Sequence, residues 1–166
     1  MLTRAFYESR ITGRFGPLIL LTLQRKCLQR NREAGITSYL FHDHERVFQV
    51  VEGEEDAVQD CLRRIGRSDL HDNIRIRAIM RCPERAFERW HFGATNIDDK
   101  DYRRVAVAGH MPDFFALDVL RAERLLSIVA SRKRRAVKAD AMAVALHNFA
   151  AGQAPKLLHS VRASAG

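Results

Sequence analysis

The first part of the chain changes from an alternating hydrophobic pattern to a helical one. Between Leu2 and Ser9 every second residue falls on the same face, as in a strand, and one face holds Thr3, Ala5, Tyr7 and Ser9. From about residue 17 to residue 34 the apolar residues recur at helical spacing, with Pro17 in the first turn and Gly35 after the last. The inward stripe of this predicted helix consists of Leu20, Leu23, Cys27 and Asn31.

The next segments complete a recognisable order of elements. The pattern predicts two short strands, a helix and two more strands, over residues 36–41, 47–52, 54–67, 74–80 and 90–95. The order βαββαββ is that of a ferredoxin-like α+β sheet with two helices on one face. We expect a parallel central pair of strands, whose right-handed crossovers place both helices on that face.

The remaining residues predict a helical extension. We expect a boundary near residue 101, which separates a first domain, 1–101, from a C-terminal extension, 102–166, with helices over about 114–131 and 134–151. These C-terminal helices would cover the other face of the sheet, since Phe6, Phe48 and Val50 point there and need a cover. The apolar residues expected to cover it are Leu117, Leu120, Ile128, Val137, Val144 and Phe149. The basic run of residues 132–135 is interpreted as a solvated junction between the two helices.

Composition narrows the class of protein. With 166 residues, 46% of them hydrophobic and 29% charged, the chain is typical of a globular protein. No apolar run is long enough to span a bilayer and no signal peptide leads the chain, so we expect a cytoplasmic protein. The three cysteines suit neither a disulfide framework nor a metal pair. The loop His42–Glu45 holds metal-ligating residue types, and we interpret it as a solvated hairpin turn.

Positive charge is concentrated towards the C-terminus. The chain carries a net charge of +8, and residues 101–166 hold 11 Lys and Arg against 5 Asp and Glu. Such a basic segment suits an acidic protein partner, nucleic acid or an anionic membrane surface. Nucleic acid is the least favoured of these partners, because the basic run 132–135 is interpreted as a solvated junction between two helices.

A few polar groups stand in apolar surroundings, where they need partners. Gln49 lies within Val47–Val51, and a buried amide without hydrogen bonds costs about 1–3 kcal/mol. Tyr7 and Gln49 would project into the same space if both strand faces look towards the helices. Asn31 and Arg64 would flank that space, and its apolar walls would come from Leu23 and Ile65. Apolar walls with a few placed polar groups are typical of a cofactor cleft.

Four segments together carry a resemblance to a known family. They are Tyr7–Ser9, Asn31 followed by Gly35–Thr37, Phe48–Gly53 and Arg85–Trp90. In this order and at these separations, they make the first 100 or so residues resemble the BLUF family, blue-light sensors that use FAD. The chain departs from the family pattern at Ser38, where the family commonly has Gly, at Phe92, where it has Met, and at Ser68–His71, where it has Asp-x-Arg-His.

The resemblance implies a photochemical switch built on FAD. Tyr7 would donate an electron and a proton, and Gln49 would bridge Tyr7 and the flavin before it rotates or changes tautomer. The signal would leave near Trp90. The residues expected to bind the cofactor are Asn31, Arg30, Arg64, Leu23, Ile65 and His71. We expect a sensor without enzymatic activity, since too few residues follow residue 101 for a cyclase or phosphodiesterase domain, and expect it to act on a downstream signalling protein and to form a homo-oligomer.

Two alternatives remain at this stage. The chain could be a flavin-free member of this fold that binds protein or nucleic acid through its basic tail. It could also be a small ferredoxin-like phosphatase whose phosphate cradle is the loop Arg10–Gly16, although Gln49 and Trp90 would then have no role. Taken singly, Gln49 could be an edge-strand residue facing water, and Asn31 a helix-end residue bonded to its own backbone.

Overall fold

The computed structural model describes residues 1–12, 17–109 and 113–150, without the side chains of residues 17–20, 23 and 144–150. The chain divides into two compact units, Met1–Ser131 and Arg132–Gly166. The expected division into domains at residue 101 stays a prediction. Within the described residues, no helix is long and apolar enough to cross a membrane.

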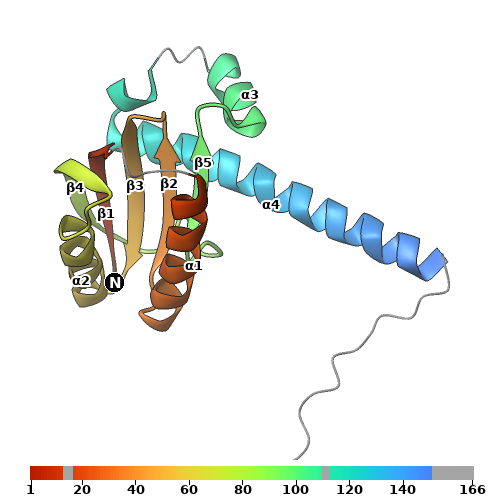
Figure 1. Ribbon diagram of the computed structural model, residues 1–166, viewed down its shortest axis with the longest axis horizontal. Coiled ribbons are helices and arrows are strands. Elements are labelled where there is room, and N and C mark those ends of the chain that lie inside the picture. Colours follow the sequence, from red (N-terminus) through yellow and green to blue (C-terminus); the bar gives the residue numbers. More distant parts are fainter. Residues whose placement is uncertain (13–16, 110–112, 151–166) are drawn as a thin grey trace, which may run out of the picture. The chain divides into compact units, whose positions relative to one another are not determined.

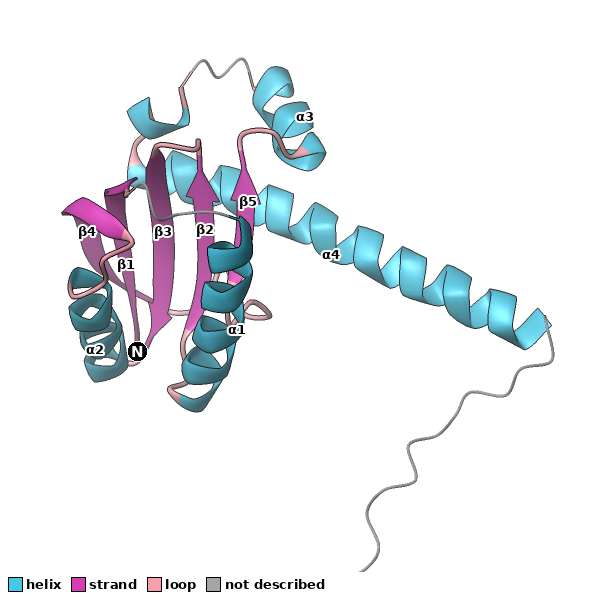
Figure 2. Ribbon diagram, in the orientation of Figure 1, coloured by secondary structure: helices cyan, strands magenta, loops and turns pink. Residues whose placement is uncertain are grey.

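The first unit is built on a five-stranded sheet (Figure 1). Its strands are β1 (Leu2–Ile11), β2 (Thr37–His42), β3 (Arg46–Gly53), β4 (His71–Cys82) and β5 (Gly93–Asn96), in the order β4-β1-β3-β2-β5. Helices α1 (Pro17–Glu33) and α2 (Glu55–Gly66) lie on one face of this sheet (Figure 2). The predicted α+β, ferredoxin-like order of elements is therefore confirmed.

The expected parallel central pair is wrong. The central strands β1 and β3 are antiparallel, with Tyr7 directly opposite Gln49 and Ala5 opposite Val51. Helix α1 connects β1 to β2, and β3 lies between these two strands in the sheet. The hairpin that joins β2 to β3 reverses the chain, so β3 is antiparallel to both of its neighbours, and β1 and β2 run in the same direction. The parallel neighbours are β2 and β5 at one edge, where Phe41 is opposite Thr95.

One long helix, and not two, follows the sheet. Helix α4 runs without interruption over Val119–Ala150, after a short helix α3 (Lys100–Ala108) and a 3-10 turn η1 (Phe114–Ala116). The basic run 132–135 thus lies inside a helix, and its interpretation as a junction is wrong. The segment contains no Gly or Pro and is rich in Ala, Leu, Arg and Lys, which favour helix throughout, so charge alone does not end it.

The sheet face opposite α1 and α2 is covered, as predicted, but by other residues than expected. Phe6, Phe48 and Val50 are buried there against α4, η1 and α3. Among the described side chains of α4, the buried ones are Ala122, Leu125, Leu126, Val129 and Ala130. Of the residues predicted to cover the face, Leu117 packs against this core, whereas Leu120, Ile128 and Val137 are 59%, 40% and 65% exposed. Val144 and Phe149 lie outside the described side chains.

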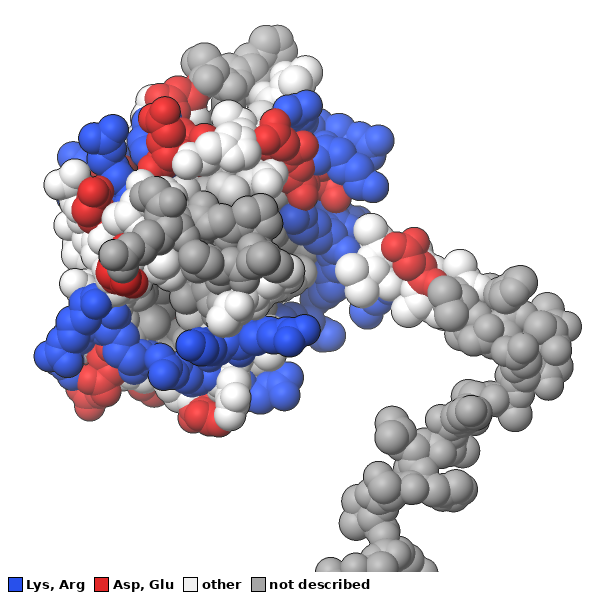
Figure 3. All heavy atoms as spheres, viewed as in Figure 1, with Lys and Arg blue, Asp and Glu red and all other residues white. Residues whose placement is uncertain are grey.

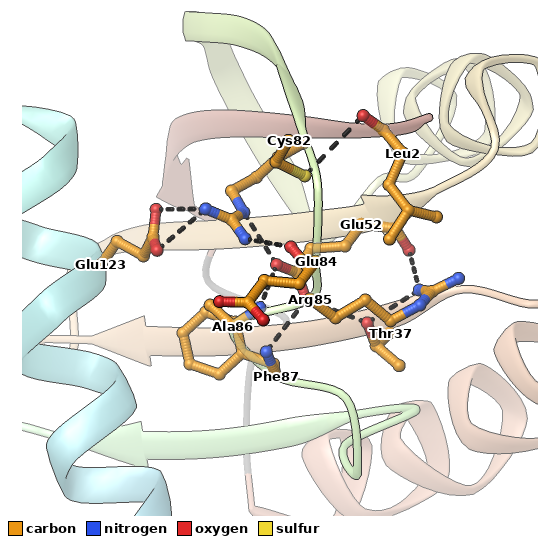
Figure 4. Close-up of polar contacts among 10 residues, drawn as sticks. Leu2, Thr37, Glu52, Cys82, Glu84, Arg85, Ala86, Phe87 and Glu123 are labelled. Atoms are coloured by element: carbon orange, nitrogen blue, oxygen red, sulfur yellow. Dashed lines mark hydrogen bonds and ion pairs between the residues drawn. The ribbon is translucent and has the colours of Figure 1, made fainter.

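A buried polar network joins the sheet to α4 (Figure 4). The Glu52 carboxylate, fully buried at the end of β3, accepts hydrogen bonds from Arg4 Nε at 2.7 Å, from Thr37 Oγ1 at 3.0 Å, and from the backbone of Ala86 and Phe87. Every acceptor of this buried charge therefore has a donor, which is what makes its burial tolerable.

Candidate functional site

A cavity of about 180 Å³ lies between the sheet and the two helices α1 and α2. Residues of six elements and two loops line it: Tyr7, Cys27, Arg30, Asn31, Leu40, Gln49, Cys61, Arg64, Ile65, Ser68, His71 and Phe92. Hereafter it is called the helix-side cavity. The walls combine apolar side chains with a few polar groups, which is the usual composition of a ligand site.

Tyr7 and Gln49 form the polar centre of this cavity. Their Cα atoms are paired across β1 and β3, and the Tyr7 hydroxyl donates a hydrogen bond to Gln49 Oε1. Both residues are buried, so the interpretation of Gln49 as an edge-strand residue facing water is wrong. Burial raises the pKa of the Tyr7 phenol well above its ordinary value, and Tyr7 therefore keeps its proton at neutral pH.

Gln49 has a second polar atom, Nε2, and a ligand that fits the cavity has to offer this donor an acceptor. Since Oε1 accepts from Tyr7, the amide presents Nε2 as its other polar atom. Within the part of the chain that the structure describes, no hydrogen bond to this Nε2 is formed, although Gln49 is only 5% exposed. A ring with hydrogen-bond acceptors at its edge, such as a flavin, would supply the missing partner and fits the donor set.

Asn31 connects the cavity to the segment before β5. Its Nδ2 donates to the His91 carbonyl at 2.5 Å and to Ser38 Oγ at 3.2 Å. Asn31 is thus not bonded to its own backbone, as the simpler interpretation held. Because His91 follows Trp90 directly, this hydrogen bond joins Asn31 to the backbone beside Trp90.

The charged residues of the cavity lie at its opening. Arg30 of α1 and Arg64 of α2 are exposed and line the cavity, and Figure 3 shows Lys and Arg side chains gathered in a band across the lower part of this face. Positive charge at a cavity mouth attracts anionic groups such as a diphosphate. His71 lies deeper, with Nδ1 3.2 Å from Ser9 Oγ, and burial lowers its pKa.

The apolar walls include residues that the sequence did not single out as binding residues. Ile65 lines the cavity as predicted, whereas Leu23 lies outside the described side chains. Additional apolar lining comes from Leu40, Phe92, Cys27 and Cys61, and the polar Ser68 lines the cavity as well. Cys27 and Cys61 could have been found from the sequence, since both occupy apolar positions on the helix faces that look towards the sheet. Leu40 could have been found by strand alternation with Tyr39 and Phe41, which face the other side.

Trp90 is the one predicted switch residue that the structure does not bring to the cavity. Its indole packs edge-on against Tyr39, with ring centroids 5.5 Å apart, and joins the core on the face that α4 covers. Phe92, two residues later, lines the cavity instead. Trp90 lies in the irregular segment before β5, where the side-chain alternation of a strand does not apply.

The other candidate sites can be placed as well. Residues 43–45 form the turn between β2 and β3, in which Asp43 binds Arg46 and His44 binds Asp98. Across the described residues, no group of His, Cys, Asp and Glu is arranged to hold a metal ion. Residues 13–16 of the suggested phosphate cradle lie outside the described residues.

Comparison with known proteins decides the family. The sequence model of BLUF, described as sensors of blue-light using FAD, matches residues 2–93. The chain belongs to the BLUF family. BLUF proteins are blue-light sensors that use a flavin, and the region matched by the family contains β1 to β4 with α1 and α2, and thus the whole helix-side cavity.

Individual relatives agree with this assignment. Photoactivated adenylate cyclase subunit beta of Euglena longa is 28% identical over 99 residues, which cover 58% of this chain and 12% of the relative. The corresponding protein of Euglena gracilis is 27% identical over the same lengths. This BLUF chain therefore spans a small part of the curated relatives that it matches.

Solved BLUF structures share the fold. The photo-activated state of BlsA superimposes with a TM-score of 0.68 at 19% identity, covering 78% of this chain and 95% of BlsA. The dark state of BlrB gives a TM-score of 0.67 at 23% identity, covering 78% and 96%. The likeness extends over more of the chain than the family match.

Proposed function

We propose that this BLUF protein binds FAD in the helix-side cavity and reports blue light through a hydrogen-bond switch formed by Tyr7 and Gln49. The observation that carries the proposal is the hydrogen bond from the Tyr7 hydroxyl to Gln49 Oε1 inside the cavity, with Gln49 Nε2 left without a partner among the described residues. A bound flavin would supply absorption of blue light and an electron acceptor.

Tyr7 and Gln49 have complementary roles in the switch. Tyr7 is the electron and proton source, since its buried phenol stays protonated and its O–H points at the amide of Gln49. That hydrogen bond holds the amide with Oε1 towards Tyr7. When Tyr7 gives up its proton, nothing fixes this orientation, and Gln49 can exchange its donor and acceptor ends by rotation or tautomerisation. The two arrangements of the amide would thus correspond to the dark and the light state.

The other cavity residues would hold and orient the cofactor. Asn31, Arg30, Arg64, Ile65 and His71 line the cavity, and the two arginines at its mouth suit the diphosphate of FAD. Leu23 is kept as a further candidate for the apolar wall. Their part is binding and orientation, whereas proton movement is confined to Tyr7 and Gln49.

The signal would pass to the opposite face through the segment before β5. Asn31 holds the carbonyl of His91, and Trp90 packs into the core shared with α4. The protein would then act without catalysis of its own, in the cytoplasm, on a separate signalling partner or through self-association. The name of the relatives, photoactivated adenylate cyclase, supports an output that lies outside the BLUF region.

A light-minus-dark absorption spectrum of the protein reconstituted with FAD tests the switch. We expect a reversible red shift of the flavin band, and its loss in Tyr7→Phe and Gln49→Leu although both variants still bind flavin. Tyr39→Phe is the matched control, because it removes an equally buried phenol O–H from the other face of the sheet. An undiminished red shift in Tyr7→Phe would contradict the proposal.

The route of the signal has its own test. Amide hydrogen exchange of α4 should change on illumination in the wild-type protein, and this change should shrink in Trp90→Phe while the red shift of the flavin band remains. If α4 exchanges identically in light and dark, the signal does not take this route.

A further inference from the structure

A second cavity, of about 290 Å³, lies on the opposite face of the sheet. It is formed where β1, β3 and β4 meet the 3-10 turn η1, and it is lined by Glu8, Ser9, Arg10, Arg46, Asn73, Arg75 and Phe115. We call it the arginine cavity. None of its lining residues lines the helix-side cavity, and the match to relatives assigns it no role.

The arginine cavity brings two like charges directly opposite each other. Arg10 of β1 and Arg46 of β3 are paired across neighbouring strands. Like charges in such a pair destabilise a sheet unless something between them carries the opposite charge. Arg46 is held by Asp43, at 2.7 and 2.9 Å, and lies 3.5 Å from Asp113.

Arg10 has no compensating ion pair among the residues that the structure describes. Among the described residues it makes no hydrogen bond or ion pair through its side chain. Its neighbour across β1 and β4 is Asp72, whose carboxylate accepts instead from Asn73 at 3.4 Å. A guanidinium carries five N–H donors in a planar fork, so the exposed Arg10 offers a free set of donors to an anion.

The carboxylate of Glu8, which lines the cavity, is already bound by other residues. Glu8 binds Arg75 through one oxygen and Arg77 through the other, the latter at 2.6 Å. Glu8 therefore fixes Arg75 at the cavity wall, and its own charge is offset by two guanidinium groups. An incoming anion would meet Arg10 and the outer N–H groups of Arg46 and Arg75 rather than a free carboxylate.

Phe115 adds a flat apolar wall beside these donors. The Arg46 guanidinium carbon lies 4.0 Å from the centroid of the Phe115 ring. Stacking of this kind holds a guanidinium in place, so that less side-chain freedom is lost when it binds a ligand. The wall also suits a ligand whose anionic group is attached to a planar ring.

We propose that the arginine cavity binds a phosphate group, as inorganic phosphate or as the phosphoester of a small molecule. Three guanidinium groups reach it from three different strands, so they can bind different oxygen atoms of one tetrahedral anion. Arginine forks match phosphate oxygens in charge and in geometry. A carboxylate has only two oxygens in one plane and would leave one of the three arginines without a partner.

Calorimetric titration of the full chain in the dark, at low salt, tests the proposal with inorganic phosphate and with phenyl phosphate as probes. We expect saturable binding of a phosphate probe, and at least about tenfold weaker binding in Arg10→Gln, the effect of losing charge-assisted hydrogen bonds. Arg104→Gln is the matched control, because it removes the same charge from an exposed position of α3 outside the cavity. It should bind as the wild type does.

The two probes separate the two sources of the phosphate group. Tighter binding of phenyl phosphate, reduced by Phe115→Leu to the level of inorganic phosphate, would identify a ring-bearing phosphoester, whereas equal binding would identify phosphate itself. The proposal is overturned if the wild type binds neither probe, or if Arg10→Gln and Arg104→Gln weaken binding equally. Circular dichroism of Arg10→Gln verifies the fold, and Arg75→Gln gives a second variant of the same cavity.

Discussion

The guanidinium of Arg4 binds Glu123, so that the first strand, β1, is tied to the long helix α4. Arg4 Nη1 donates to both carboxylate oxygens of Glu123, at 2.9 and 3.0 Å, while its Nε donates to Glu52. The side chains of Arg4 and Glu52 are 10% and 0% exposed. One arginine thus neutralises a buried carboxylate of the sheet and holds α4 against it.

We expect the removal of the Arg4 side chain to lower the free energy of unfolding substantially. Arg4→Met would leave the Glu52 carboxylate buried without its counter-charge, and we expect a loss of about 3 kcal/mol in the free energy of unfolding. Glu123→Gln keeps a hydrogen-bond acceptor for Arg4 and should cost only about 1 kcal/mol. Denaturant titration followed by circular dichroism measures both. Arg81→Met is the control, because the Arg81–Glu55 pair is 65% and 52% exposed and such pairs contribute about 0–1 kcal/mol.

Gly93 is expected to tolerate no side chain. It begins β5, and a Cβ atom built there would overlap the Tyr39 ring and lie 2.8 Å from Trp90 Cε3. Gly93→Ala should therefore destabilise the protein by about 1–3 kcal/mol and displace Trp90. The free energy of unfolding and the Trp90 fluorescence spectrum report the two effects. A variant with wild-type stability and fluorescence would show that Trp90 does not pack against Tyr39 and Gly93.

We expect the titration of His71 to lower the free energy of unfolding in mild acid. Burial lowers its pKa in the folded protein below the ordinary value of about 6.5. Below that pH the unfolded chain binds more protons than the folded one, so stability declines as the pH falls from about 6.5 towards the folded-state pKa. Above about pH 6.5 both states are neutral at this group and stability is unaffected by it. Burial and the neighbouring His44 lower the pKa of His42 as well, which acts in the same direction.

Thermal unfolding at about pH 7.5 and about pH 5.5 checks this expectation. The unfolding temperature of the wild type should be lower at the acid pH, and the decrease should be smaller in His71→Gln, although His42 preserves part of it. Equal decreases in the two proteins would show that His71 does not titrate differently on folding.

The cysteine of α2 is expected to be unreactive in the native protein. Burial raises the pKa of Cys61 to about 11, and it also raises the pKa values of Cys27 and Cys82. Since the thiolate is the reactive form, iodoacetamide at neutral pH should label Cys61 far more slowly in the native than in the denatured protein. Mass spectrometry of the digested protein follows each site. Labelling of native Cys61 at the rate of the denatured chain would contradict the burial of this thiol.

The central residues of the candidate site, Tyr7 and Gln49, could be predicted because side chains alternate between the two faces of a strand. Alternation places Tyr7 on the strand face of Ala5, and Gln49 on the strand face of Val47 and Val51. On the assumption that both faces look towards the helices, the positions of Asn31 and Arg64 near the helix ends place these two residues beside them. Trp90 could not be placed in this way, since it lies in an irregular segment where neither period holds. The resemblance to a family pointed to Trp90 but carried no information on the direction of its side chain.

Other features escaped prediction for different physical reasons. Strand direction in the centre of the sheet depends on which strand a crossover passes, and hydrophobic pattern does not record this. The run 132–135 suggested a junction because it is charged, whereas helix propensity without Gly or Pro favoured one continuous helix. The arginine cavity could not be predicted from the sequence, because Arg10, Arg46 and Arg75 come from three strands that are far apart along the chain.

Gln49 and Val50 are consecutive residues of the central strand, yet the first faces the helix-side cavity and the second is packed among the aromatic residues on the opposite side. The two faces of the sheet are therefore separated here by a single peptide unit. If the proposed reorientation of the Gln49 amide twisted this strand, the residues of both faces would be displaced together, without the movement of a separate domain.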